Sequence, residues 1–182
     1  MINKPFKRTV RQLKDGSYSH SGNGLYVIDK DYSEDPQHYV RAFLLIQEDL
    51  LEILRYVDPN DLNDNTISLK IHELLVRTCI EIEASFTAIL TENIYSENPD
   101  RFSMVNDYCL IEQSHRLSKY EVKLPVWTGA KNIIIPFKDW VNVSPKNWTP
   151  LTWYQAYNKS KHNRHLHFEK ASFRNLLDAV AG

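Results

Sequence analysis

The side chains best suited to chemistry gather near the C-terminal end of the sequence, in the segment 154–167. On an α-helix of ~3.6 residues per turn, Tyr154, Asn158 and His162 are four residues apart and stack along one face. Lys161 and His165 lie alongside that face. Imidazoles move protons near neutral pH, and an ammonium group beside them can hold a phosphate oxygen. The segment predicts acid–base chemistry on a phosphate-bearing substrate, and a hydrated helix end is the alternative interpretation.

The other edge of the same predicted helix carries Trp153, Tyr157 and Arg164. Aromatic rings beside basic groups suit stacked nucleic-acid bases. We therefore expect His162 to act as the acid–base group with Asn158 orienting it. We expect a binding role for Lys161, Arg164 and Tyr154.

Three histidines, His162, His165 and His167, also raise the question of a metal ion. Imidazoles at positions i and i+3 can share an ion, but no Asp or Cys adjoins them. The sequence also contains no Gly-rich phosphate loop, no G-x-S-x-G motif and no H-E-x-x-H motif. We expect neither a metal nor a cofactor.

Glu83 lies among apolar residues of a second predicted helix. A carboxylate in such surroundings is expected to be partly buried, and it then needs a cation or a hydrogen-bond donor. We predict that Glu83 meets a basic or hydrogen-bonding side chain of another helix. It or Arg77 is expected to approach the face that carries Asn158, Lys161 and His162. Glu83 is then a further candidate catalytic residue, and Arg77 a further candidate binding residue. A purely structural salt bridge is the alternative role for Glu83.

Five helices must position these residues, and hydrophobic periodicity with capping signals predicts them at 36–57, 69–95, 100–114, 149–164 and 172–181. Two short strands at 120–124 and 133–137 are expected to form a hairpin around Thr128-Gly129-Ala130. Residues 1–24 are expected to form a basic arm and loop, and residues 25–28 a short strand. The fold class is therefore mainly α, a helical bundle with a small β element, in which residues 25–182 form one domain.

Composition narrows the classes of function. The chain carries 22 basic and 23 acidic residues, so its net charge of −1 argues against a surface coated for nonspecific nucleic-acid binding. Basic residues nevertheless concentrate at both ends. Cys79 and Cys109 are too few and too far apart for a disulfide framework. No signal peptide or membrane-spanning run is recognisable, and the longest apolar run is Ala42–Ile46, so we expect a cytoplasmic protein.

Two patterns together resemble the HEPN superfamily: Arg77-x3-Glu81-x-Glu83 on the long helix and Asn158-Lys-Ser-Lys-His162 on a basic helix. The chain is also similar to bacterial helical proteins of uncharacterised function that carry a Tyr-Asn-x-x-Lys-His segment. The resemblance covers about a third of the chain. It implies a small helical bundle from a bacterial toxin–antitoxin or phage-defence system. It further implies metal-independent RNA cleavage by a homodimer.

Ribonucleases of that superfamily carry an arginine followed after four to six residues by a histidine, and no arginine of this chain has that spacing. Three hypotheses follow. The chain is a ribonuclease with a rearranged site, in which His162 assists attack of a ribose 2′-hydroxyl on the adjacent phosphate. It is a non-catalytic module that binds a nucleotide, RNA or a protein through the same face. It is a structural or regulatory protein whose polar face is only solvated.

Overall fold

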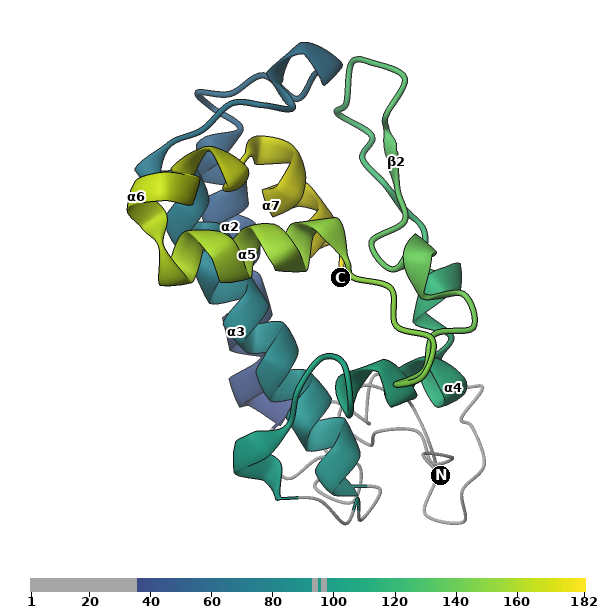
Figure 1. Ribbon diagram of the computed structural model, residues 1–182. Helices are drawn as coiled ribbons and strands as arrows, with labels where there is room; N and C mark the ends of the chain where they lie inside the picture. Colours follow the sequence, from purple (N-terminus) through teal and green to yellow (C-terminus); the bar gives the residue numbers. More distant parts are fainter. Residues whose placement is uncertain (1–35, 93–94, 96–97) are drawn as a thin grey trace.

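The computed structural model describes residues 36–92, 95 and 98–182. The predicted basic arm 1–24 and the predicted strand 25–28 lie outside these residues. In the described part of the chain, helices α2 to α7 alternate with short 3₁₀ turns, and two strands form one small sheet (Figure 1). The predicted class, mainly α with a minor β element, is confirmed.

Two long antiparallel helices follow the predicted ranges closely. Helix α2 spans Pro36–Ile53 and is followed by turns before Asp58-Pro59, where proline disfavours helical backbone in the preceding residue. Helix α3 spans Leu69–Glu92. The Ser68 hydroxyl accepts the Ile71 amide at 3.1 Å, so Ser68 is the N-cap of α3.

The predicted helix 100–114 is wrong. This region contains the 3₁₀ turns Pro99–Arg101 and Tyr108–Ile111 and the four-residue helix α4, Glu112–His115. Asp107 explains the interruption, because its carboxylate accepts the Ser103 amide at 2.7 Å and the Tyr95 hydroxyl at 3.1 Å. Local side-chain bonds of this kind compete with a continuous helix.

The predicted hairpin exists, but its strands are shorter than expected. Strand β1, Val122–Lys123, pairs antiparallel with β2, Ile133–Ile134, with Val122 opposite Ile134. Pro125 and Pro136 lack the amide that a longer ladder needs.

A single carboxylate organises the loop of this hairpin. Asp61 accepts the Trp127 indole N–H at 2.6 Å and the backbone amides of Ala130 at 2.9 Å and Lys131 at 3.2 Å. Gly129 passes so close that an added Cβ would lie 2.6 Å from Asp61 Cγ. The hairpin is therefore fixed to the α2–α3 connection.

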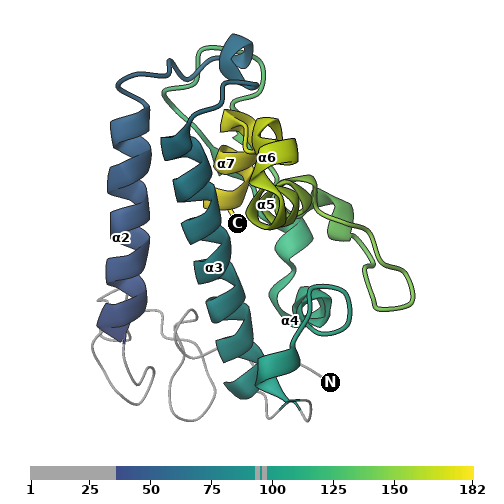
Figure 2. The ribbon, with the colours of Figure 1, turned by 60° about the vertical axis from the view of Figure 1, so that its left-hand side comes forward.

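Helix α3 separates two groups of elements. Helix α2 lies along one side of α3, whereas α5, Thr152–His162, and α7, Phe173–Val180, pack on the other side (Figure 2). Helix α6, Arg164–His167, connects these two. The predicted helix 149–164 thus begins later and is interrupted at Asn163.

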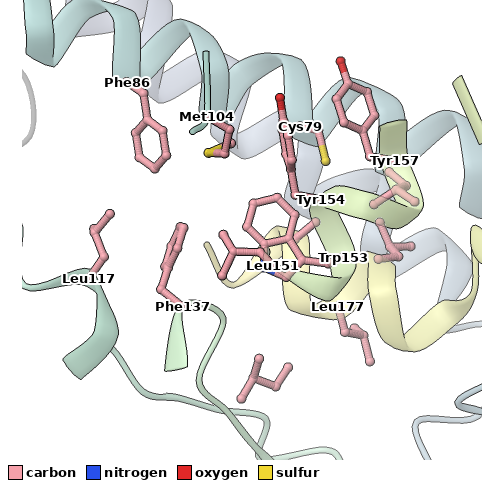
Figure 3. Close-up of a cluster of buried hydrophobic side chains, with 14 of the residues drawn as sticks. Cys79, Phe86, Met104, Leu117, Phe137, Leu151, Trp153, Tyr154, Tyr157 and Leu177 are labelled. Atoms are coloured by element: carbon pink, nitrogen blue, oxygen red, sulfur yellow. The ribbon is translucent and has the colours of Figure 1, made fainter. Parts of the chain in front are cut away.

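The core is aromatic and lies between α3, α5, α7 and the segment that follows the hairpin. Phe137, Trp140, Trp153, Tyr157 and Phe173 are among its largest fully buried side chains. Figure 3 shows Tyr154 and Tyr157 beside Cys79, where α5 packs against α3. Cys79 and Cys109 are both buried and free.

Candidate functional site

Helix α5 is the element that carries the predicted site, and its buried face fixes its rotation. Trp153, Ala156 and Tyr157 are buried, and the Trp153 indole donates to the Pro136 carbonyl at 2.8 Å. Because these side chains turn inward, Asn158 lies at the boundary of the core and His162 in solvent. The face shared by Tyr154, Asn158 and His162 therefore runs from the core to the surface.

Glu83 of α3 meets this helix at Tyr154. The Tyr154 hydroxyl donates to Glu83 Oε1 at 2.6 Å. Glu83 is only partly exposed. The prediction that Glu83 meets a hydrogen-bonding side chain of another helix is confirmed, and its partner is a hydroxyl donor rather than a cation.

Burial controls the protonation of Tyr154. Burial, the hydrogen bond to Glu83 and the charge of that carboxylate raise the pKa of Tyr154 far above its usual value. The phenol therefore stays protonated and serves as a donor to Glu83. Burial and the Glu83 charge likewise raise the pKa of the Cys79 thiol, which makes this cysteine a poor nucleophile.

Lys161 lies one turn beyond Tyr157 on the same helix. Its Nζ donates to the Tyr157 hydroxyl at 2.7 Å and lies 4.4 Å from the centre of the Tyr157 ring. Burial acts to lower the pKa of Lys161, but the hydrogen bond to Tyr157 and the charges of Tyr157 and Glu83 outweigh it and raise the pKa. Lys161 therefore stays a cation, and its ammonium group is held in place by the hydroxyl of the buried Tyr157.

Asn163 ends α5 and begins α6. Its side-chain oxygen accepts the Leu166 amide at 3.3 Å, an N-cap bond that starts a new helical turn. His165 therefore does not continue alongside the face of Asn158 and His162, and Arg164 does not continue the edge of Trp153 and Tyr157, so the predicted placement of these two residues is wrong. Both side chains are nevertheless exposed.

Residues 159–167 therefore form an exposed, mainly cationic stretch from the end of α5 through α6, which we call the basic segment. Its exposed charged or titratable side chains are Lys159, Lys161, His162, Arg164 and His165. The first acidic residue after it is Glu169. A segment of this kind can bind anions such as phosphate or carboxylate groups, which Arg and Lys recognise through charge-assisted hydrogen bonds.

Two sequence expectations do not fit this geometry. Arg77 points to α2, where it forms an ion pair with Asp49 and donates to the Leu45 carbonyl at 3.3 Å. It is therefore separate from the contacts of α5. Tyr154 and Trp153 are only 8% and 2% exposed, so these rings anchor α5 and do not form an open stacking surface.

Sequence reasoning missed Tyr157 as the partner of Lys161. The two residues are four apart on one helix, and this spacing was the available signal. It also missed a polar pocket of ≈ 420 Å³ at the other end of α5, lined by the ion pairs of Lys131 with Asp64 and Arg174 with Asp178. Asp64 and Lys131 are distant in sequence from each other and from the Arg174–Asp178 pair of α7, so no common motif joins the four residues.

Comparisons with known proteins do not assign this chain to a family. No protein family, no curated protein and no solved structure matches it. The HEPN resemblance stays a prediction. In the described residues, no group of three His, Cys, Asp or Glu side chains could hold a metal ion. Within the same part of the chain, no helix is both long enough and apolar enough to cross a membrane.

Proposed function

We propose that this protein binds single-stranded RNA through the basic segment. The observation that carries the proposal is the exposed group of three cations and two imidazoles at the end of a helix whose other face is buried. Buried Trp153 and Tyr157 hold the helix in place, so the cations project from a rigid support rather than from a flexible tail. A rigid support lowers the entropy lost on binding.

The charges of the segment suit a polyanion better than a single small anion. Lys161 is positioned by Tyr157, whereas Lys159 and Arg164, which flank it in sequence, are exposed and form no ion pair with the residues that the structure describes. Successive phosphates of one strand can engage these separate cations, and each contact adds to affinity by releasing counterions. Because the aromatic rings of α5 are buried, we expect binding to depend on the backbone phosphates and not on stacking with those rings.

Cleavage of the bound RNA is a second candidate, favoured by the two exposed imidazoles, His162 and His165, among these cations. In this reaction a neutral imidazole removes the proton of a ribose 2′-hydroxyl, whose oxygen attacks the adjacent phosphorus. The bond to the 5′-oxygen breaks, and a protonated imidazole supplies the proton to the leaving oxygen. His162 is the candidate base, and a Lys or Arg of the segment neutralises the phosphate.

The test is a binding assay on a mixed-sequence single-stranded RNA over a range of salt concentrations. Arg164→Ala should weaken binding and reduce the slope of log K against log salt by about 0.7 for each lost phosphate contact. Arg164 is preferable to Lys161 because Lys161→Ala also removes the contact with Tyr157. Lys119→Ala, which removes an exposed cation from the 3₁₀ turn Leu117–Lys119, is the matched control and should bind like wild type.

The same RNA, labelled at one end and incubated with wild type, reports cleavage. His162→Ala should abolish any product while binding is retained. If wild type binds RNA but cuts none, the binding function stands and the ribonuclease candidate is withdrawn. If wild type does not bind at low salt, or if Lys119→Ala weakens binding as much as Arg164→Ala, the proposal fails.

A further inference from the structure

The polar pocket at the N-terminal end of α5 has a volume of ≈ 420 Å³ and is built by four separate parts of the chain. Asp64 comes from the connection between α2 and α3, and Lys131 from the loop of the hairpin. Arg174 and Asp178 come from α7, and Thr152 begins α5. Pockets of about 300–1,000 Å³ hold small molecules, so this one is large enough for a metabolite.

Hydrogen bonds join these parts of the chain around the pocket. The Arg174 amide donates to the Asp64 carbonyl at 2.9 Å, and the Phe173 amide donates to the Thr66 carbonyl at 2.8 Å. The Arg174 guanidinium donates to the Lys131 carbonyl at 3.2 Å. The charged side chains are therefore attached to backbone that is already ordered, which lowers the entropy lost when a ligand binds.

The pocket combines charges of both signs. Three cations and three carboxylates line it: Lys131, Lys138, Arg174, Asp64, Asp139 and Asp178. Two ion pairs use four of these groups, Lys131 with Asp64 and Arg174 with Asp178. Neither Lys138 nor Asp139 forms an ion pair with the residues that the structure describes. A ligand of one sign would be repelled by half of the groups, whereas a zwitterion can match both signs.

Asp64 is a buried group of the pocket that lacks a donor. This residue is only 7% exposed, and one of its carboxylate oxygens pairs with Lys131. The other oxygen, Oδ1, is buried and accepts no hydrogen bond from the described residues. A buried oxygen without a donor is destabilising, so a ligand that supplies one is bound favourably. Because rotation about the Cβ–Cγ bond interchanges the two oxygens, a ligand ammonium group can share Asp64 with Lys131.

Asp178 is also incompletely neutralised. Burial raises the pKa of Asp178, and the charges of Arg174 and Lys138 lower it without cancelling the effect of burial. The negative charge of Asp64 raises the pKa further, so the two carboxylates lie close enough to repel each other. A further cation near both carboxylates is therefore favourable.

The rest of the lining is apolar. Ile133 and Ile135 lie beside the charged groups, together with Pro136 and Trp153. A pocket with a few polar groups against an apolar wall favours a ligand that is charged at one end and apolar at the other.

We propose that this pocket binds an α-amino acid with an apolar side chain. The ammonium group of the ligand contacts Asp64 and Asp178, its carboxylate contacts Lys138, and its side chain packs against Ile133 and Ile135. The proposal does not rest on RNA binding, because the basic segment lies at the opposite end of α5.

The first measurement is a calorimetric titration of the full-length chain with L-leucine, L-isoleucine, L-valine, L-methionine and L-phenylalanine. At least one of them should bind saturably. Two analogues of leucine keep its branched chain and lose one charge: isocaproate lacks the ammonium group, and isoamylamine lacks the carboxylate. Each should bind at least about tenfold more weakly than L-leucine, because each loses one set of charge-assisted hydrogen bonds. If another amino acid binds more tightly, its own acid and amine analogues replace these two.

Single substitutions then assign the two charges of the ligand. Lys138→Gln removes an exposed cation and should weaken amino-acid binding several-fold without affecting the amine analogue, which has no carboxylate. Asp178→Asn should weaken binding of the amino acid and of the amine, but not of the acid analogue. Lys119→Gln removes an exposed cation that does not line the pocket and should bind like wild type. Far-UV circular dichroism should show the same helix content in all four proteins, and Lys138→Gln alone decides if Asp178→Asn does not fold.

Three results would overturn the proposal. If none of the five amino acids binds at millimolar concentration, the charged groups are only a structural ion-pair cluster. If the acid analogue binds as tightly as the amino acid, the pocket is a simple anion site. If Lys119→Gln weakens binding as much as Lys138→Gln, the amino acid binds elsewhere.

Discussion

At the residue scale, the contact between Glu83 and Tyr154 joins the long helix to the helix of the candidate site. Tyr154→Phe should cost ~1.5–3 kcal/mol of unfolding free energy, because it leaves a partly buried carboxylate without its donor. Glu83→Ala should cost a similar amount, and the double variant should cost less than the sum of the two. Urea unfolding of the four proteins measures this coupling.

Glu81→Ala is the control on the same helix. Glu81 has no ion pair among the described residues, so its removal should change stability by no more than ~0.5 kcal/mol. Equal losses for Glu81→Ala and Glu83→Ala would show that the contact with Tyr154 contributes nothing specific.

Asp61 is a second single residue with a defined effect, and it acts through pH. The hydrogen bond from Trp127 lowers the pKa of Asp61, burial opposes it, and the amides of Ala130 and Lys131 lower the pKa further. A carboxylate whose pKa is lower in the folded state stabilises the protein above its unfolded pKa of 3.8. That stabilisation is lost as the pH falls through the lower, folded value.

Asp61→Asn should therefore be less stable than wild type at pH 6, and the difference should shrink steadily between pH 4 and pH 2. Thermal unfolding at several pH values measures it. A difference that stays constant or grows as the pH falls would contradict the assigned cause.

At the element scale, the hairpin depends on the close approach of Gly129 to Asp61. A methyl group at Gly129 would push against a carboxylate that three hydrogen bonds hold in place. Gly129→Ala should therefore destabilise the protein by ~1–3 kcal/mol. In an Asp61→Ala background the same substitution should cost much less, because the obstructing group is gone. Additive losses in the double variant would show that Gly129 is needed for another reason.

The elements also show how far the sequence determines the structure. Helices α2, α3 and α7 were predictable, because apolar periodicity and local caps such as Ser68 agree at their ends. The region 100–114 was not, because its backbone follows the bonds that Asp107 makes with Ser103 and Tyr95 rather than its apolar spacing. The break at Asn163 has a similar origin, in one side-chain oxygen that starts a new turn.

At the scale of the whole molecule, only one part of the candidate site could be predicted from the sequence. The face of Tyr154, Asn158 and His162 follows from spacing along one helix. The choice between Glu83 and Arg77 as the residue that meets α5 depends on how α3 is rotated between its neighbours. Arg77 finds Asp49 of α2 instead, and nothing in its local sequence indicates that partner.

The one-sided packing of α2 has a consequence for the dynamics of the native state. Helix α3 contacts α2, α5 and α7, whereas α2 packs mainly on α3 (Figure 2). The side chains of the ion pairs that join α2 to α3, Asp49 with Arg77 and Glu52 with Lys70, are 34% to 52% exposed, so these pairs contribute little. The backbone amides of α2 should therefore exchange with deuterium through local unfolding, at a free energy below that of global unfolding. Those of α3 should exchange only when the whole domain unfolds. Native-state exchange followed by mass spectrometry at increasing urea measures both, and identical urea dependence in the two helices would show that they unfold together.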